Sequence, residues 1–316
     1  MAYVEEVFKG KKRYYYLAQT IRMKDNKFKK IRVLLGEGNL SVEALAKLSA
    51  SAQQQLQDKM QGIKKVENIF QLDAPTITKL EQIKKGYRRL LSSVSPIEYQ
   101  VIERQQFIRF TFNTNAIEGS TVTLQETAHL LEDGLAPAGK DLREIHEVEN
   151  TKAAYHFMKK YRGRMNSKFI KTIHYHLTHN ILGENAGRFR TIQVYMTGSQ
   201  HTPPRAWELT NKMNSMLAWL RNHAHENQVL LAAYIHHFFI AIHPFLDGNG
   251  RTGRLLFNYM LMKSGFPPIC IQKEEKIKYI TCLEQARDGN ASPLVLFIIE
   301  KVEKAYAELL DTVRRK

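Results

Sequence analysis

A glycine-rich turn between two apolar helical patterns restricts the fold of this chain more than any other feature. The two patterns lie at about residues 228–241 and 250–264, and the segment 243–254 joins them with three glycines. We call residues 243–254 the glycine loop. Pro244 cannot continue a helix, and glycine adopts backbone conformations that other residues avoid. The pattern therefore predicts a helix, a tight turn and a second helix.

Helical signals also fill most of the remaining chain. Ser95 with Glu98, and Thr123 with Glu126, have the spacing of capping boxes, in which each residue of the pair bonds the backbone of the other. Apolar residues at helical spacing predict further helices. The helices are expected at about 41–61, 75–91, 96–112, from 124, 141–161, 167–181, 205–222, 228–241, 250–264, 273–287 and 294–314. The fold class is therefore predicted to be mainly α.

The N-terminal residues have the sequence pattern of β-strands and not of helices. β-favouring residues at 14–21 and 31–35 flank a polar turn at 24–27, which predicts a small β-hairpin. A second hairpin is predicted at 188–204, where β-formers alternate and Gly198 lies near the tip. The expected domains are a basic β-hairpin at 1–36, a helical accessory region at 37–94 and a larger helical core at 95–316.

The chain is strongly basic. It contains 47 Lys and Arg residues against 31 Asp and Glu residues, a net charge of +16, and residues 1–40 contribute ten basic and four acidic residues. A basic surface with interleaved aromatic residues can bind nucleic acid, although a solvated strand face explains the same charge and is the favoured interpretation.

Other classes of protein are excluded by simple patterns. No apolar run approaches the ~20 residues that cross a membrane, and the N-terminus lacks the apolar region of a signal peptide, so we expect residence in the cytoplasm. The two cysteines, Cys270 and Cys282, are too few for a disulfide scaffold and do not form a C-x-x-C pair.

Three common phosphate or metal motifs fail in the glycine loop. Its G-x-G-x-x-G spacing follows a helical pattern and not the strand of a dinucleotide site. Arg254 and Leu255 stand where a P-loop requires Lys and Ser or Thr, and a calcium loop starting at Asp247 would lack its final Glu.

The physical content of these motifs nevertheless remains. Closely spaced glycines allow backbone N–H groups to form a concave anion site, and the following helix adds the positive end of its dipole. Arg251 and Arg254 lie on the first turn of that helix and can reach a polyphosphate. Asp247 is suited to bind a magnesium ion that bridges phosphates, and His243 is suited to accept a proton from an attacking hydroxyl.

The glycine loop resembles the signature H-P-F-x-D/E-G-N-G-R-x-x-R of the Fic (filamentation-induced-by-cAMP) family, whose members typically transfer AMP from ATP to a protein hydroxyl. The resemblance implies a Fic-type helical core with His243 as general base and Asp247 as the Mg²⁺ ligand. The remaining residues that it implies for ATP and its phosphates are Gly248, Asn249, Gly250, Arg251 for the diphosphate and Arg254 for the γ-phosphate.

Two further segments resemble parts of this family. Residues 114–119 match the inhibitory motif S/T-x-x-x-E-G/N, which implies a class II arrangement with an inhibitory helix at 95–119, in which Glu118 pairs with Arg254 and blocks productive ATP binding. The hairpin 188–204 is similar to the family's flap, on which a protein substrate docks. The residues that could touch the adenine side are Met196, His201 and Tyr279.

The sequence therefore predicts an autoinhibited protein adenylyltransferase that modifies a Ser, Thr or Tyr hydroxyl of a target protein or of itself. Three alternatives stay open: removal of AMP from modified protein by the same site, transfer of another part of a nucleotide, and a nucleotide-sensing module with a basic docking or nucleic-acid-binding region. The last helix, 293–315, is amphipathic and suits packing or a contact within a homo-oligomer.

Overall fold

The computed structural model describes residues 2–10, 12–22, 28–67, 71–196 and 201–314. Contacts divide the chain into two units, Met1–Gln71 and Leu72–Lys316, each of which is described by itself. Unit 1 contains β1 (Tyr3–Lys9), β2 (Lys12–Arg22), β3 (Phe28–Glu37) and α1 (Val42–Glu67). The long helices of unit 2 are α2 (Ala74–Ser93), α3 (Pro96–Glu118), α4 (Leu124–Asp133), α5 (Leu142–Lys160), α6 (Ser167–Leu182), α7 (Leu209–Asn222), α8 (Gln228–Ile242), α9 (Asn249–Lys263), α10 (Lys276–Arg287) and α11 (Ser292–Arg314).

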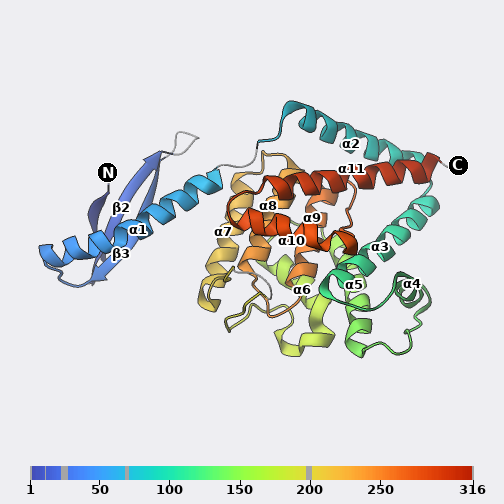
Figure 1. Cartoon of the computed structure of the whole chain (residues 1–316), viewed down its shortest axis with the longest axis horizontal. Helices are drawn as coiled ribbons and strands as arrows, with labels where there is room; N and C mark the ends of the chain where they lie inside the picture. The colour runs from blue at the N-terminus through green and yellow to red at the C-terminus, as the bar shows by residue number, and fades with distance from the viewer. Residues whose placement is uncertain (1, 11, 23–27, 68–70, 197–200, 315–316) are drawn as a thin grey trace. The chain divides into compact units, whose positions relative to one another are not determined.

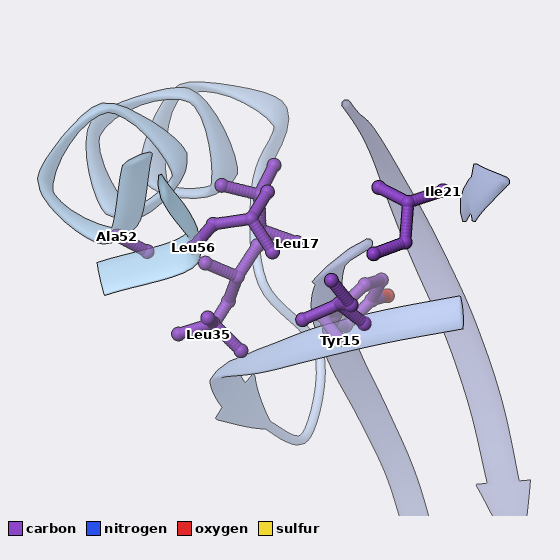
Figure 2. Close-up of a cluster of buried hydrophobic side chains, with 8 residues drawn as sticks. Tyr15, Leu17, Ile21, Leu35, Ala52 and Leu56 are labelled. Atoms are coloured by element: carbon purple, nitrogen blue, oxygen red, sulfur yellow. The ribbon is translucent and has the colours of Figure 1, made fainter. Parts of the chain in front are cut away.

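Unit 1 is a three-stranded antiparallel sheet, in the order β1-β2-β3, with α1 packed on one face. Alternate residues of β2, including Tyr15 and Leu17, point into the core, where Ala52 and Leu56 of α1 meet them (Figure 2). The predicted hairpin corresponds to β2 and β3, and β1 extends it by pairing with β2. The predicted turn at 24–27 lies outside the described residues.

An ion-pair cluster on the sheet joins Glu5 of β1 to Lys30 and Arg32 of β3. Glu5 accepts hydrogen bonds from Lys30 at 2.8 Å and from Arg32 at 2.5 Å, and these bonds hold the pKa of its carboxyl at about 2. Because one carboxylate is shared by two cations, the three side chains carry a net single positive charge.

The core of unit 2 forms around α8, which is apolar on nearly all sides. Helices α7, α9, α10 and α11 contact α8, and α2 lies along α11, where Tyr87 and Leu90 pack on Leu309 (Figure 1). Because α1 packs on the sheet and α2 on the helical core, the division between the units falls inside the predicted accessory region 37–94. The predicted domain boundaries at 36/37 and 94/95 stay predictions.

Both predicted capping boxes are present, at the starts of α3 and α4, and the mainly α fold is confirmed. The described residues of the predicted hairpin 188–204 contain no strand, and its predicted tip at 197–200 lies outside them. The side chain of Arg190 donates to the carbonyl oxygens of Ile192 and Pro204, so a side chain takes up acceptors that a strand ladder would use. No helix among the described residues has both the length and the apolar character needed to span a membrane.

Candidate active site

The glycine loop begins with an unusual backbone conformation at the end of α8. Among the described residues, His243 is the one non-glycine residue with a positive φ, at 48°. Its own N–H donates to Phe239 O at 3.0 Å, and Arg190 holds the following turn. The Arg190 Nε donates to His243 O and its backbone N–H donates to Pro244 O, both at 2.9 Å. Arg190 therefore fixes the turn that presents the His243 side chain.

The interior of the loop is filled by an aromatic ring. Phe245 is fully buried and stacks on the imidazole of His174, with ring centres 3.7 Å apart. Asn249 closes the loop around it, because its side chain accepts from Phe245 N at 3.0 Å and donates to Phe245 O at 2.9 Å. The Asn249 side chain is thus committed to the loop, which leaves its backbone N–H for an anion.

His174 supports the same loop from α6. Its Nδ1 accepts from Gly187 N at 2.9 Å, so its Nε2 is the donor to Asp247 O, also at 2.9 Å. Burial lowers the pKa of His174 to about 4, in agreement with a neutral ring that both accepts and donates. Its partners in the glycine loop, Phe245 and Asp247, are 71 and 73 positions away, and no local sequence pattern links them to His174.

At two glycines of the loop, an added side chain would be crowded by its neighbours. Gly248 caps α9 with a φ of 72°, and a Cβ there would press on Thr178 at 3.0 Å. At Gly250, a Cβ would collide with Oε1 of Glu118. The first N–H groups of α9 have no acceptor within the helix, so this glycine-lined helix start is suited to bind an anion.

Arg254 is buried and is held by α3. Its Nη2 lies 2.6 Å from Glu118 Oε1, and its Nε and Nη2 donate to the hydroxyl and carbonyl oxygens of Thr114 at 2.7 and 2.8 Å. Burial opposes the charge on Glu118, but Arg254 outweighs it and holds the pKa of that carboxyl below its ordinary value. The structure thus contains the ion pair between Glu118 and Arg254 that the sequence predicts.

Arg251 is equally buried, but it pairs with a carboxylate that the sequence analysis did not connect with the site. Its Nη1 lies 3.1 Å from Oε1 of Glu147 on α5, whereas Asp247 Oδ1 is 4.0 Å from its Nη2. Arg143, one turn before Glu147, donates its Nε to the same Oε1 at 3.3 Å and also pairs with Asp247. Residues 143 and 147 have the i,i+4 spacing of a helical ion pair, but nothing in that spacing points to the glycine loop.

His243 has the protonation state of a base. Burial lowers its pKa to about 4, so the ring is neutral near pH 7. Its Nδ1 is buried and has no hydrogen-bond partner within the part of the chain that the structure describes. A neutral imidazole beside a helix start that binds anions can accept a proton from a group attacking a phosphate.

The three residues predicted for the adenine side lie in different surroundings. Tyr279 is buried, and its hydroxyl lies 2.6 Å from Nε2 of His236. His201 Nε2 lies 2.9 Å from Ala241 O at the end of α8, and Met196 Sδ lies 3.9 Å from Arg287. Their contacts with adenine stay predictions.

A magnesium ion is implied by the resemblance, and the residues of the site fit one. The described residues contain no group of three or more His, Cys, Asp or Glu side chains that could enclose a metal. Mg²⁺ in nucleotide sites is commonly bound by one or two carboxylates together with phosphate oxygens. Asp247 supplies such a carboxylate: burial raises its pKa, but Arg251, the Gly248 N–H and Arg143 together keep it below the ordinary value.

Comparison with known proteins agrees with this geometry. Residues 164–261 match the Fic/DOC family. The chain is 34% identical to a protein adenylyltransferase Fic of Aedes aegypti over 241 residues, which are 74% of this chain and 47% of the relative. It is 30% identical to a protein of the same name in Nematostella vectensis over 242 residues, 75% of this chain and 56% of the relative. The chain therefore spans about half the length of these relatives.

Solved structures give the same fold. Fic-1 of C. elegans superposes with a TM-score of 0.69 at 24% identity, covering 88% of this chain and 79% of that one. A Fic-domain signaling protein of Bacteroides thetaiotaomicron gives 0.68 at 23% identity, covering 75% of this chain and 97% of that one. The match of residues 164–261, which include the glycine loop, shows that the chain contains a Fic domain, and these solved structures share its fold.

Proposed function

We propose that the protein is an autoinhibited adenylyltransferase, which transfers AMP from ATP to a Ser, Thr or Tyr hydroxyl of a target protein or of itself. The observation that carries the proposal is the placement of a neutral, half-buried His243 next to a helix start whose first turn holds two buried arginines. The name of the curated relatives, protein adenylyltransferase, supports the same reaction.

In the proposed reaction, His243 removes the proton of the attacking hydroxyl. The hydroxyl oxygen then forms a bond with the α-phosphorus while the bond from that phosphorus to the diphosphate breaks, which yields the AMP ester and diphosphate. The N–H groups at the start of α9, including that of Gly250, bind the phosphates, and Arg251 neutralises charge on the diphosphate. Asp247 would hold Mg²⁺, which supplies further positive charge to the phosphates.

The proposed inhibition is a competition for Arg254. Glu118 contacts Arg254 directly and fills the space beside Gly250, where the phosphates would bind. While this pair persists, the γ-phosphate has no free guanidinium, and ATP cannot align its α-phosphorus with the hydroxyl. Removing the carboxylate should therefore activate the enzyme.

The protein substrate is proposed to dock on the segment 188–204. Ile192 and Tyr195 in this segment are 61% and 76% exposed, which leaves large apolar surfaces available to a partner. Arg190 ties the same segment to the backbone of His243, so a peptide bound there would lie near the base.

Isotope transfer tests this function. Wild type, Glu118→Gly and the double variant Glu118→Gly/His243→Ala are incubated with magnesium and ATP labelled on the α- or the γ-phosphate. We expect protein-bound α-label to rise about 10- to 100-fold in Glu118→Gly, the range for loss of one to two charge-assisted hydrogen bonds, and to vanish in the double variant. Transfer of γ-label instead would indicate phosphorylation and refute the proposal.

Incubation with a protein that already carries AMP tests the alternative in which the same site removes AMP. If wild type released AMP from a modified protein while Glu118→Gly did not, the same site would hydrolyse the AMP ester, with water as the attacking group and Glu118 positioning that water. Equal α-label in wild type and Glu118→Gly would contradict the inhibitory role of the carboxylate.

A further inference from the structure

Helix α5 contacts the glycine loop through two side chains, Glu147 and Arg143. Oε1 of Glu147 lies 3.1 Å from Nη1 of Arg251 and 3.3 Å from Nε of Arg143. Arg143 in turn pairs with Asp247. Glu147 thus contacts Arg251, which is proposed to bind the diphosphate. Through Arg143 it is also linked to Asp247, which is proposed to bind the metal.

The pair between Glu147 and Arg251 is almost fully removed from solvent. The side chains are 9% and 2% exposed, so neither charge is compensated by water, and a buried charge requires a partner. Arg143, by contrast, is 57% exposed and has solvent as an alternative. The Glu147–Arg251 pair is therefore the fixed part of this network.

Arg251 still has unused donors. Its Nε and its Nη1 are both buried and have no hydrogen-bond partner in the described part of the chain, so the 3.1 Å contact of Nη1 with Glu147 is an ion pair without hydrogen-bond geometry. Buried donors are normally satisfied, so an unsatisfied one beside a helix start indicates a place for an acceptor that comes with a ligand. A phosphate oxygen is such an acceptor.

Glu147 differs from Glu118 in its position relative to the glycines. The atoms nearest to a Cβ on Gly250 belong to Glu118 and Arg254, and those nearest to a Cβ on Gly248 belong to Thr178 and His174. None belongs to Glu147. Glu147 thus holds its arginine without entering the space in which the phosphates are proposed to bind.

We propose that Glu147 is a positioning residue: it fixes the guanidinium of Arg251 before nucleotide arrives, so that Arg251 recognises the diphosphate end of ATP without first losing side-chain freedom. This inference rests on the proposed function for the assignment of Arg251 to the diphosphate. A long side chain that is already immobilised loses less conformational entropy on binding than a free one. The contribution concerns the β- and γ-phosphates, which AMP lacks.

The test is a comparison of two nucleotides by calorimetry. Glu147→Gln is made in the Glu118→Gly background, and the affinities for ATP and AMP are measured in EDTA, so that neither metal nor turnover enters. We expect ATP to bind about tenfold more weakly, equivalent to about 1.4 kcal/mol, while AMP changes by less than about twofold. The matched control is Glu149→Gln, because Glu149 lies on the same helix, is 54% exposed and pairs with His146.

Two results would overturn the inference. Equal weakening of ATP and AMP would mean that the variant distorts the whole loop, and unchanged ATP affinity would mean that Arg251 does not depend on Glu147. Should Glu147→Gln not fold, Glu147→Asp keeps the charge at a shorter reach and is expected to give a smaller loss for ATP, again without a change for AMP. If Glu118→Gly transferred no α-label, the proposed reaction would fail, whereas the ratio of ATP to AMP affinity would still report on Glu147.

Discussion

The two arginines of the first turn of α9 are buried to nearly the same extent, but the glutamates that pair with them differ in exposure. Arg251 and Arg254 are 2% and 3% exposed at the side chain. The carboxylate of Glu147, which holds Arg251, is 9% exposed, whereas that of Glu118, which holds Arg254, is 37% exposed. An anion arriving from solvent can replace a partner that it can reach. The comparison therefore separates a permanent ion pair from one that nucleotide can exchange.

The remaining contacts of each arginine reinforce this difference. Arg254 also donates to the hydroxyl and the carbonyl oxygen of Thr114, so it keeps neutral acceptors when Glu118 is removed. For Arg251 the next carboxylate oxygen, on Asp247, is 4.0 Å away. Loss of Glu147 would leave a buried charge with much weaker compensation.

The largest expected effect is on stability. Glu147→Ala should lower the free energy of unfolding by about 3 kcal/mol, since breaking a buried pair strands its partner, while Glu118→Ala should lower it by less than about 1 kcal/mol. Urea denaturation of the full chain, followed for unit 2 by tryptophan fluorescence of Trp207 and Trp219, measures both changes.

A double-mutant cycle that combines Glu147→Ala with Arg251→Met measures how much of this loss of stability comes from the ion pair. The coupling energy between positions 147 and 251 should exceed that between positions 118 and 254. Equal losses for the two alanine variants would remove the distinction between a permanent and an exchangeable pair.

The second effect is on nucleotide affinity and has opposite signs for the two carboxylates. Glu118→Gln should tighten ATP binding by about tenfold, because the γ-phosphate no longer competes with a carboxylate for Arg254. Glu147→Gln should weaken it. Titration of each single variant with ATP decides the matter, and a change in the same direction for both would show that the two pairs do not play different parts.

The smallest effect is on pH dependence. Because burial holds the pKa of His243 at about 4, the neutral base persists as pH falls, and kcat/KM of Glu118→Gly should stay nearly constant from about pH 8 to pH 5.5. An ordinary imidazole would lose half of its neutral form near pH 6.5. Glu118 has a lowered pKa and stays ionised in this window, so wild type should differ in rate but not in the shape of the profile.

A profile that falls with a midpoint near pH 6.5 in Glu118→Gly would contradict the burial of His243 in the working enzyme. Circular dichroism at each pH serves as the control, because His174, His236 and His237 also have lowered pKa values and must gain protons when the chain unfolds in acid.

Local patterns predicted the parts of the fold that local physics determines. The capping boxes at Ser95 and Thr123 set the starts of α3 and α4. Apolar spacing located most ends of the long helices to within three residues, but α1 and α3 continue six residues beyond their predicted ends. The ion pair of Glu118 with Arg254 was also predictable, because the two short motifs that contain them could each be recognised.

The parts that escaped prediction depend on tertiary placement. Arg143 meets Asp247 across 104 residues, and Arg190 supports His243 across 53. Each of these side chains would be an ordinary surface charge if its helix or segment packed elsewhere. In the segment 188–204, β-favouring residues predicted strands. The side chain of Arg190 instead donates to backbone carbonyl oxygens on both arms of the segment, so these acceptors are not available to a strand ladder.

The missing side chain at Gly250 has a genetic consequence. The volume beside it accommodates the Glu118 carboxylate in the structure and, in the proposed reaction, the phosphates of ATP. A side chain there would press on the Glu118 carboxylate and would take up the space proposed for the phosphates. A selection for constitutively active variants should therefore recover substitutions at position 118 but none at position 250, although the two residues are in contact. The Glu118 carboxylate and the ATP phosphates use the same small space, and mutation can remove the carboxylate without removing activity.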